Sequence, residues 1–213
     1  MGETHSRAPK ATRPLIRRLS RRFLPIDTVE LARYLLGKML VRDLAEGRMS
    51  GRIVETEAYI IGDEAGHAFH GPTARNRALY LARGHAYVYF IYGTSYLLNV
   101  TSELPGIGAG VLLRALEPVE GIELMKRGRD FTPAALLTNG PGRLTAALRI
   151  DRRFDGVDLC RDRRLWLGAS SRGHHPASIG ESVRTGVTRA AHRVLRFYEH
   201  GNPFVSGPKR LRS

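Results

Sequence analysis

The chain has 213 residues, 42% of them hydrophobic, so it can bury a core and is too apolar to be disordered throughout. No apolar run is long enough to cross a bilayer, and a single cysteine, Cys160, excludes an internal disulfide. The 34 Lys and Arg against 20 Asp and Glu give a net charge of +14, which favours a polyanionic partner. Charge alone does not separate DNA from RNA or an acidic membrane.

The first 22 residues are basic, with seven Lys or Arg and one acid, and they lack the apolar stretch of a signal peptide. We interpret residues 1–22 as a mobile basic arm; a solvated tail without a binding role and a transit peptide are the alternatives. A globular domain is expected over residues 23–206, followed by a basic tail at 207–213.

Hydrophobic periodicity and turn residues predict the elements in chain order. Asp27 and Glu30 form a capping-box-like pair, which predicts a helix that ends near Gly37. Strands are expected over 38–44, 51–59, 111–116 and 194–199, with a hairpin over 86–92 and 95–101. Further helices are expected from Pro118 to about Arg127 and from Pro141 to about Arg149. Strands grouped in hairpins, with helices between some of them, favour an α+β fold over regular βαβ alternation.

The strand expected over 51–59 brings Glu55, Glu57 and Tyr59 to the same face. A carboxylate at the mouth of a pocket can orient or deprotonate water. The alternative is a polar, solvent-facing side of an antiparallel strand. Nothing in the local pattern distinguishes Glu55 from Glu57.

Arg114 closes the otherwise apolar run VLLRA and therefore needs a partner, most simply a carboxylate that it would hold ionised. A buried ion pair without a catalytic role is the alternative.

The loop expected over 73–77 (TARNR) suits phosphate oxygens, or is an ordinary exposed basic loop. Tyr92 at the hairpin tip can insert between stacked bases, whereas Tyr87 is expected in the core.

A group of acidic residues and histidines follows the order D-E-x-x-H-x-x-H, which raises the question of a metal. The H-E-x-x-H arrangement is absent, so we expect polar pocket or surface residues and neither a metal nor another cofactor. A metal-dependent nuclease built on these residues is one rival function, and a non-catalytic nucleic-acid-binding protein is the other. The residues concerned are Asp63, Glu64, His67 and His70.

Taken together, several segments resemble the alkyladenine (3-methyladenine) DNA glycosylase family in their order and spacing. The resemblance covers about residues 23–206 and implies a single mixed α/β domain with a curved, mainly antiparallel sheet, a protruding hairpin and flanking helices. The segments are GRIVETEAY (51–59), DEAGHA (63–68), ARNR (74–77), YVYFIYG (87–93), Asn99, VLLRALEP (111–118), NGPGRL (139–144) and LRFYEHGNPFVS (195–206).

The resemblance also implies roles for individual residues. Glu57 matches the carboxylate that activates water, and Arg114 matches its partner. Asn99 matches the position that disfavours undamaged guanine, and Val187 offers backbone contacts to the pocket. The residues that sandwich the flipped base are Tyr59, His67 and Tyr89.

On the DNA side, the resemblance implies that Tyr92 fills the vacated stack and that Arg75 and Asn76 support the DNA-facing loop. It predicts a monofunctional base-excision repair enzyme that flips and hydrolyses alkylated purines out of duplex DNA, with hypoxanthine as a further candidate. We expect a monomer without a membrane or obligate protein partner, in the cytoplasm or nucleoid of a bacterium or the nucleus of a eukaryote. Ile60 and Ile61 replace a more polar turn of the family, so the pocket edge is expected to differ.

Overall fold

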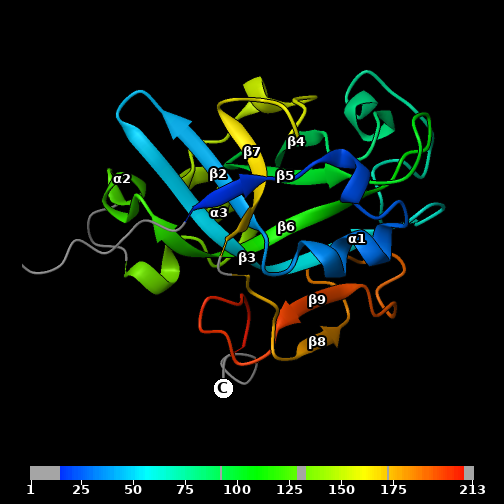
Figure 1. The fold of residues 1–213 in the computed structure, drawn as a ribbon. Coiled ribbons are helices and arrows are strands. Elements are labelled where there is room, and N and C mark those ends of the chain that lie inside the picture. The colour runs from blue at the N-terminus through cyan, green and yellow to red at the C-terminus, as the bar shows by residue number, and fades with distance from the viewer. Residues whose placement is uncertain (1–14, 92, 129–132, 172, 209–213) are drawn as a thin grey trace, which may run out of the picture.

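The computed structural model describes residues 15–91, 93–128, 133–171 and 173–208, which form nine strands of one antiparallel sheet with short helices around it (Figure 1). The sheet order is β1-β7-β2-β3-β6-β5-β4, with β9 added to β3 and β8 to β9. None of the helices in these ranges is long and apolar enough to span a membrane. The strands are β1 Ile16–Arg18, β2 Met39–Leu44, β3 Gly47–Tyr59, β4 Ala86–Ile91, β5 Ser95–Thr101, β6 Gly110–Glu120, β7 Leu165–Ser170, β8 Ile179–Ser182 and β9 Arg196–Glu199; the α-helices are α1 Thr28–Leu35, α2 Ile122–Lys126 and α3 Pro141–Ala147.

The long strand β3 is the centre of the sheet because three other strands pair with it. One edge of β3 pairs with β6, and the other edge is shared, first by β2 and then by β9. The pairing with β6 is irregular on both sides of Glu55, and such irregularities bend a strand. The second part of β3 therefore leaves β2 and lies between β6 and β9, where it carries Glu55 and Glu57.

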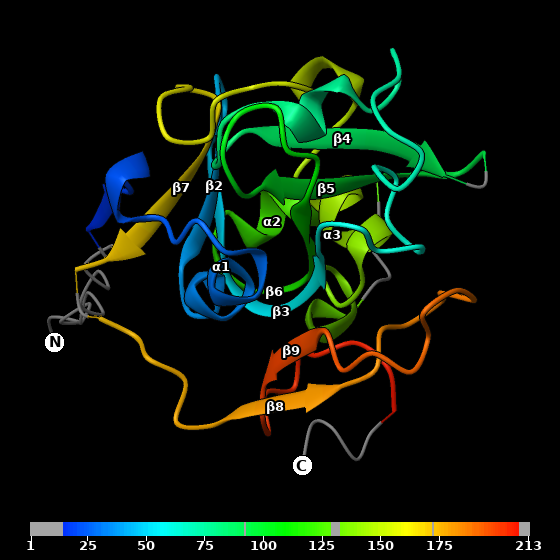
Figure 2. The same cartoon turned by 90° about the vertical axis from the view of Figure 1, so that its right-hand side faces the viewer.

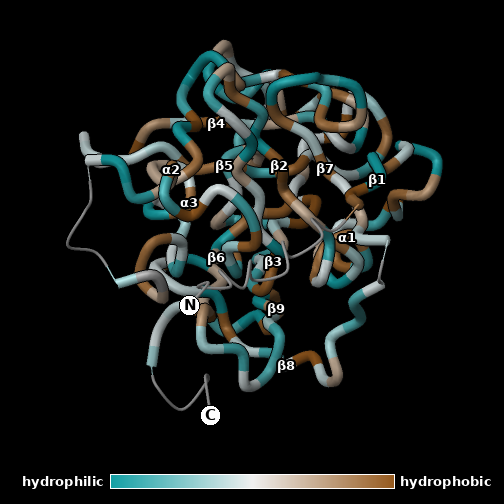
Figure 3. Tube along the Cα trace, turned by 60° about the vertical axis from the view of Figure 1, so that its left-hand side comes forward, coloured by the Kyte–Doolittle hydropathy of each residue, from teal (hydrophilic) through white to brown (hydrophobic). Residues whose placement is uncertain are grey.

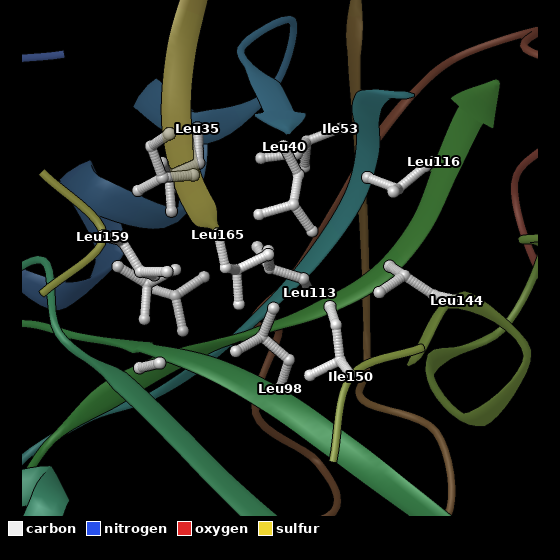
Figure 4. Close-up of a cluster of buried hydrophobic side chains, with 14 of the residues drawn as sticks. Leu35, Leu40, Ile53, Leu98, Leu113, Leu116, Leu144, Ile150, Leu159 and Leu165 are labelled. Atoms are coloured by element: carbon white, nitrogen blue, oxygen red, sulfur yellow. The ribbon is translucent and has the colours of Figure 1, made fainter. Parts of the chain in front are cut away.

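The main hydrophobic core lies between the sheet and the elements that cover it, and Figure 4 shows its centre. Burying each Leu or Ile side chain contributes roughly 1.5–3 kcal/mol, so this cluster supplies most of the driving force for folding. Figure 3 shows that hydrophilic residues also lie within the sheet, including along β3 and β9. The residues labelled in Figure 4 are Leu35, Leu40, Ile53, Leu98, Leu113, Leu116, Leu144, Ile150, Leu159 and Leu165.

The structure confirms the predicted fold class, the first helix and the hairpin. Asp27 caps α1 by accepting hydrogen bonds from the backbone N–H groups of Val29 (2.8 Å) and Glu30 (2.9 Å). Gly37 follows the helix at φ +80°, a left-handed conformation that suits glycine. Strands β4 and β5 pair from Ala86↔Val100 to Ile91↔Ser95 and form a hairpin that extends from the body of the molecule (Figure 2).

The helix predicted to begin at Pro118 is wrong. Strand β6 continues through Pro118 to Glu120, and α2 begins only after Gly121, which adopts φ +74°. Strand β5 pairs with only the first three residues of β6, so among the described residues no strand pairs with that edge of β6 at Pro118. A proline without an N–H is tolerated at such an edge, which is why the strand continues past it.

Strand β3 also begins earlier than predicted, at Gly47, because only a two-residue turn separates it from β2. Three strands were not predicted: β1, β7 and β8. Strand β1 lies inside the segment interpreted as a basic arm and pairs with β7 from Ile16↔Ser170 to Arg18↔Gly168. The chain thus enters the sheet before residue 23, and the rest of the predicted arm, residues 1–14, is not among the described residues.

Candidate active site

A cavity of about 810 Å³ lies where three connections meet: loop 60–76, the β4–β5 hairpin and loop 183–195. Figure 2 shows these connections on the same side of the sheet. The cavity is lined by Arg114, Tyr59, His67, Tyr89, Asn99, Val187, Arg75 and Asn76, all of which the sequence had singled out. Glu57 lies behind this lining, and Tyr92 falls outside the described residues.

Glu57 is fully buried, and every partner recorded for its carboxylate lines the cavity. Its Oε1 accepts a hydrogen bond from the backbone N–H of Thr185 (2.7 Å) and lies 3.2 Å from Nη1 of Arg114. Its Oε2 accepts a hydrogen bond from the Tyr59 hydroxyl at 3.1 Å. A guanidinium and two hydrogen-bond donors thus hold this carboxylate against the cavity lining, where a general base can reach water.

Glu55 is equally buried, but of its hydrogen-bond donors Arg114 alone belongs to the cavity lining, while Arg196 and Ser206 do not. Its Oε1 accepts from Nε of Arg114 and Nε of Arg196, both at 2.7 Å, and from Oγ of Ser206 at 2.9 Å. Its Oε2 accepts from the backbone N–H of Ser206 at 2.6 Å. Four hydrogen bonds join this carboxylate of β3 to β6, β9 and the C-terminal segment. Neither glutamate lines the cavity itself, so their partners distinguish them. The solvent-facing interpretation of this strand face is therefore wrong for both glutamates.

Arg114 connects the two carboxylates. Burial lowers the pKa of its guanidinium, but the charges of Glu57 and Glu55 raise that pKa by more, so the group stays cationic. The pKa of the Tyr59 hydroxyl is raised well above its ordinary value, first by burial and then by the charge of Glu57. Tyr59 is therefore a neutral phenol that donates its proton in the hydrogen bond to Glu57.

Aromatic rings form one wall of the cavity. His67 and Tyr89 meet edge to face with ring centroids 4.4 Å apart, and Tyr87 stacks on Tyr89 at 5.2 Å. The Tyr87 hydroxyl and Nδ1 of His67 share a hydrogen bond of 2.8 Å. Desolvation and the charge of Arg75 lower the pKa of His67, and burial raises the pKa of Tyr87 to about 12. Both groups are therefore neutral near pH 7.

The asparagines have internal partners. Asn99 is buried on β5 and donates from Nδ2 to the carbonyl of Tyr87 at 3.4 Å. Asn76 donates to the carbonyls of His67 (2.7 Å) and Gly71 (3.0 Å) and accepts from the backbone N–H of Thr73 (2.6 Å). Because these bonds close the loop that carries His67, Asn76 supports this wall of the cavity. Arg75, in contrast, is exposed at the cavity.

The proposed metal ligands do not come together. Asp63 is buried in an ion pair with Arg184, and His67 is hydrogen-bonded to Tyr87. Within the residues that the structure describes, no group of three or more His, Cys, Asp or Glu side chains is arranged to hold a metal ion.

Sequence reasoning missed three residues at the site. Tyr87 was placed in the core, yet it also lines the cavity and contacts His67. Thr185 contributes only its backbone N–H, which leaves no signature in a side-chain pattern. Arg184 lies three residues before Val187, but its distant partner, Asp63, could not be read from the sequence.

Comparisons with known proteins identify the family. A buried carboxylate beneath an aromatic cavity, in a chain of net charge +14, suits hydrolysis at a planar group of a polyanion. The profile of the family described as methylpurine-DNA glycosylase matches residues 22–203. The chain belongs to this family and is a DNA N-glycosylase of base-excision repair.

Individual relatives agree with this assignment. A Mesorhizobium japonicum protein named "Putative 3-methyladenine DNA glycosylase" is 57% identical over 211 residues, which cover 99% of each chain. A Paraburkholderia phytofirmans protein of the same name is 53% identical over 88% of this chain and 87% of its own. The DNA-3-methyladenine glycosylase of Mus musculus is 43% identical over 89% of this chain and 61% of the mouse protein.

Proposed function

We propose that this chain hydrolyses alkylated purines of the 3-methyladenine and 7-methylguanine type from duplex DNA, with Glu57 activating the attacking water. The observation that supports this most directly is the setting of the Glu57 carboxylate. It is fully buried, and its neighbours Thr185, Arg114 and Tyr59 all belong to the cavity lining. A water at this floor would meet an ionised base with fixed orientation.

A damaged base must leave the helical stack before a side chain can reach its glycosidic bond. Alkylation at N3 or N7 gives the purine a positive charge, which favours contact with the faces of Tyr59 and Tyr89 through cation–π attraction. The lowered pKa of His67 keeps that ring neutral, so it does not repel a cationic base. The cavity is therefore suited to a planar cation.

The alkylated base is already a good leaving group, so bond cleavage needs little acid assistance. As the bond to the base breaks, the sugar develops oxocarbenium character, and the negative charge of Glu57 would stabilise it. Glu57 then takes a proton from the water whose oxygen bonds to the sugar. Hypoxanthine is neutral and needs more help as it leaves, which makes alkylated purines the better substrates.

The described cavity lining contains no lysine, so no amine is positioned to form a Schiff base with the sugar. A monofunctional reaction follows, with water as the only nucleophile. We further propose that Arg75 contacts the DNA backbone, that Tyr92 fills the vacated stack, that Asn99 excludes undamaged guanine, and that the chain acts as a monomer.

The experiment compares wild-type protein with Glu57→Gln on duplexes that carry a single 3-methyladenine or hypoxanthine. Base release by the wild type and its loss in the variant support the proposal. Strand breaks without base release, abolished by a chelator, would instead indicate a nuclease based on Asp63 and the nearby histidines. Binding of the duplex without either product would indicate a non-catalytic DNA-binding protein.

A further inference from the structure

The loops 60–76 and 183–195, which both line the cavity, bury few of their residues. In loop 60–76 the buried residues are Asp63 and Asn76, and in loop 183–195 they are Arg184 and Leu195. Asp63 and Arg184, 121 positions apart in the chain, form an ion pair whose side chains are both 0% exposed.

The guanidinium of Arg184 binds the carboxylate of Asp63 through two parallel hydrogen bonds. Nη1 of Arg184 donates to Oδ2 of Asp63, and Nη2 donates to Oδ1 at 3.0 Å. The same Nη1 donates to the carbonyl of Ala58 at 3.1 Å, and the guanidinium lies 4.6 Å over the ring of Tyr59. Arg184 therefore contacts the end of β3 as well as the other loop.

Each partner is also tied to groups that face the cavity. Thr185, whose N–H binds Glu57, directly follows Arg184. Asp63 accepts from the N–H of Ala65 with Oδ1 (3.1 Å) and from the N–H of Gly66 with its carbonyl (2.8 Å), which shapes the turn before His67. A shift of either side chain would thus move a group that contacts the reacting carboxylate or the base.

We propose that Asp63 and Arg184 are positioning residues of the glycosylase reaction, which set the Thr185 N–H, the Tyr59 ring and the His67 loop in their active arrangement. This inference rests on the proposed function. A buried ion pair contributes little net stability compared with apolar residues of similar size, because desolvation offsets the attraction. Its two-point geometry fixes orientation, and a displacement of about 1 Å at a reacting group costs on the order of 100-fold in rate.

The test uses Arg184→Met, Arg184→Lys and the double variant Asp63→Asn with Arg184→Met. In Arg184→Met the buried Asp63 loses its partner, so this variant is expected to melt at a lower temperature. The double variant removes both charges and should recover much of that melting temperature. Arg184→Lys keeps the charge but loses the planar two-point contact.

Two readouts distinguish positioning from stability alone. The first is the single-turnover rate of 3-methyladenine release, expected to fall about 10- to 100-fold in Arg184→Met and in the double variant, and less in Arg184→Lys. The second is hydrogen exchange of peptides from 60–68 and 183–189, expected to accelerate in both loops when either residue changes. The control is Arg153→Met, which removes the exposed Asp151–Arg153 pair and should alter neither readout.

The proposal is overturned if the double variant regains the wild-type rate together with its melting temperature. It is also overturned if exchange accelerates only in the loop that carries the substitution. If the wild-type protein releases no base, the proposed function fails, while hydrogen exchange still decides whether the pair couples the two loops.

Discussion

The two buried glutamates of β3 should respond differently to the same substitution. Glu57→Gln keeps the shape of the side chain, and an amide can still bond to the Thr185 N–H and the Tyr59 hydroxyl. Arg114 keeps its second carboxylate, Glu55, at 2.7 Å. The change therefore removes the base and its charge while leaving the buried network largely satisfied. Loss of a general base lowers the rate of base release by about 10²- to 10⁴-fold.

Glu55→Gln should act on stability instead. Arg196 then loses its carboxylate partner, Arg114 keeps Glu57, and all four donors to Glu55 lose a charged acceptor. Breaking a buried pair costs about 3–5 kcal/mol, and an amide that keeps some of the hydrogen bonds should place the loss at or below the lower end.

The assay follows base release from a duplex with one 3-methyladenine under single-turnover conditions, with protein in excess, and records a melting curve for each variant. Glu57→Gln should slow base release with little change in melting temperature. Glu55→Gln should lower the melting temperature, while the molecules that stay folded release the base at close to the wild-type rate. If Glu57→Gln released the base at the wild-type rate while Glu55→Gln did not, the assignment of the two carboxylates would be refuted.

Four further outcomes test the remaining reasoning. Asn99→Ala should release undamaged guanine that the wild type leaves in place; unchanged selectivity contradicts its role. The NMR titration of His67 should have its midpoint below 6.5, because desolvation and Arg75 disfavour the protonated ring, and Arg75→Gln should raise that midpoint. Borohydride should trap no covalent protein–DNA adduct, since one would require an amine nucleophile. Affinity for undamaged duplex should fall steeply with salt, and a flat response would contradict the electrostatic account.

Local signals in the sequence predicted those elements that local interactions determine. The Asp27 cap bonds to residues two and three positions away, and the β4–β5 hairpin closes through neighbouring residues, so both can be read from a short window. Strands β1 and β7 pair across about 150 positions and are short and partly exposed, so their periodicity is weak. Pro118 misled the prediction because its effect depends on whether a neighbouring strand occupies that edge of β6.

Within the site, too, local signals could be read from the sequence and long-range contacts could not. The eight singled-out residues that line the cavity were found because the family resemblance marks their side chains by type and order. The Thr185 amide could not be found in this way, since any residue supplies an N–H. Asp63 was noticed only within a group that raised the question of a metal, yet its partner is Arg184, and a sequence pattern around either residue does not contain the other.

What separates Glu57 from Glu55 is also a long-range contact. Both side chains lie near Arg114, so period-two alternation correctly places them together and cannot rank them. Ser206 and Arg196, about 140 to 150 residues away, distinguish the two glutamates because they donate hydrogen bonds to the Glu55 carboxylate inside the protein. Glu57 is left with partners that face the cavity. The role of one carboxylate thus depends on how the C-terminal segment satisfies the other, and changes at Ser206 should be felt first as lost stability and only then as lost rate.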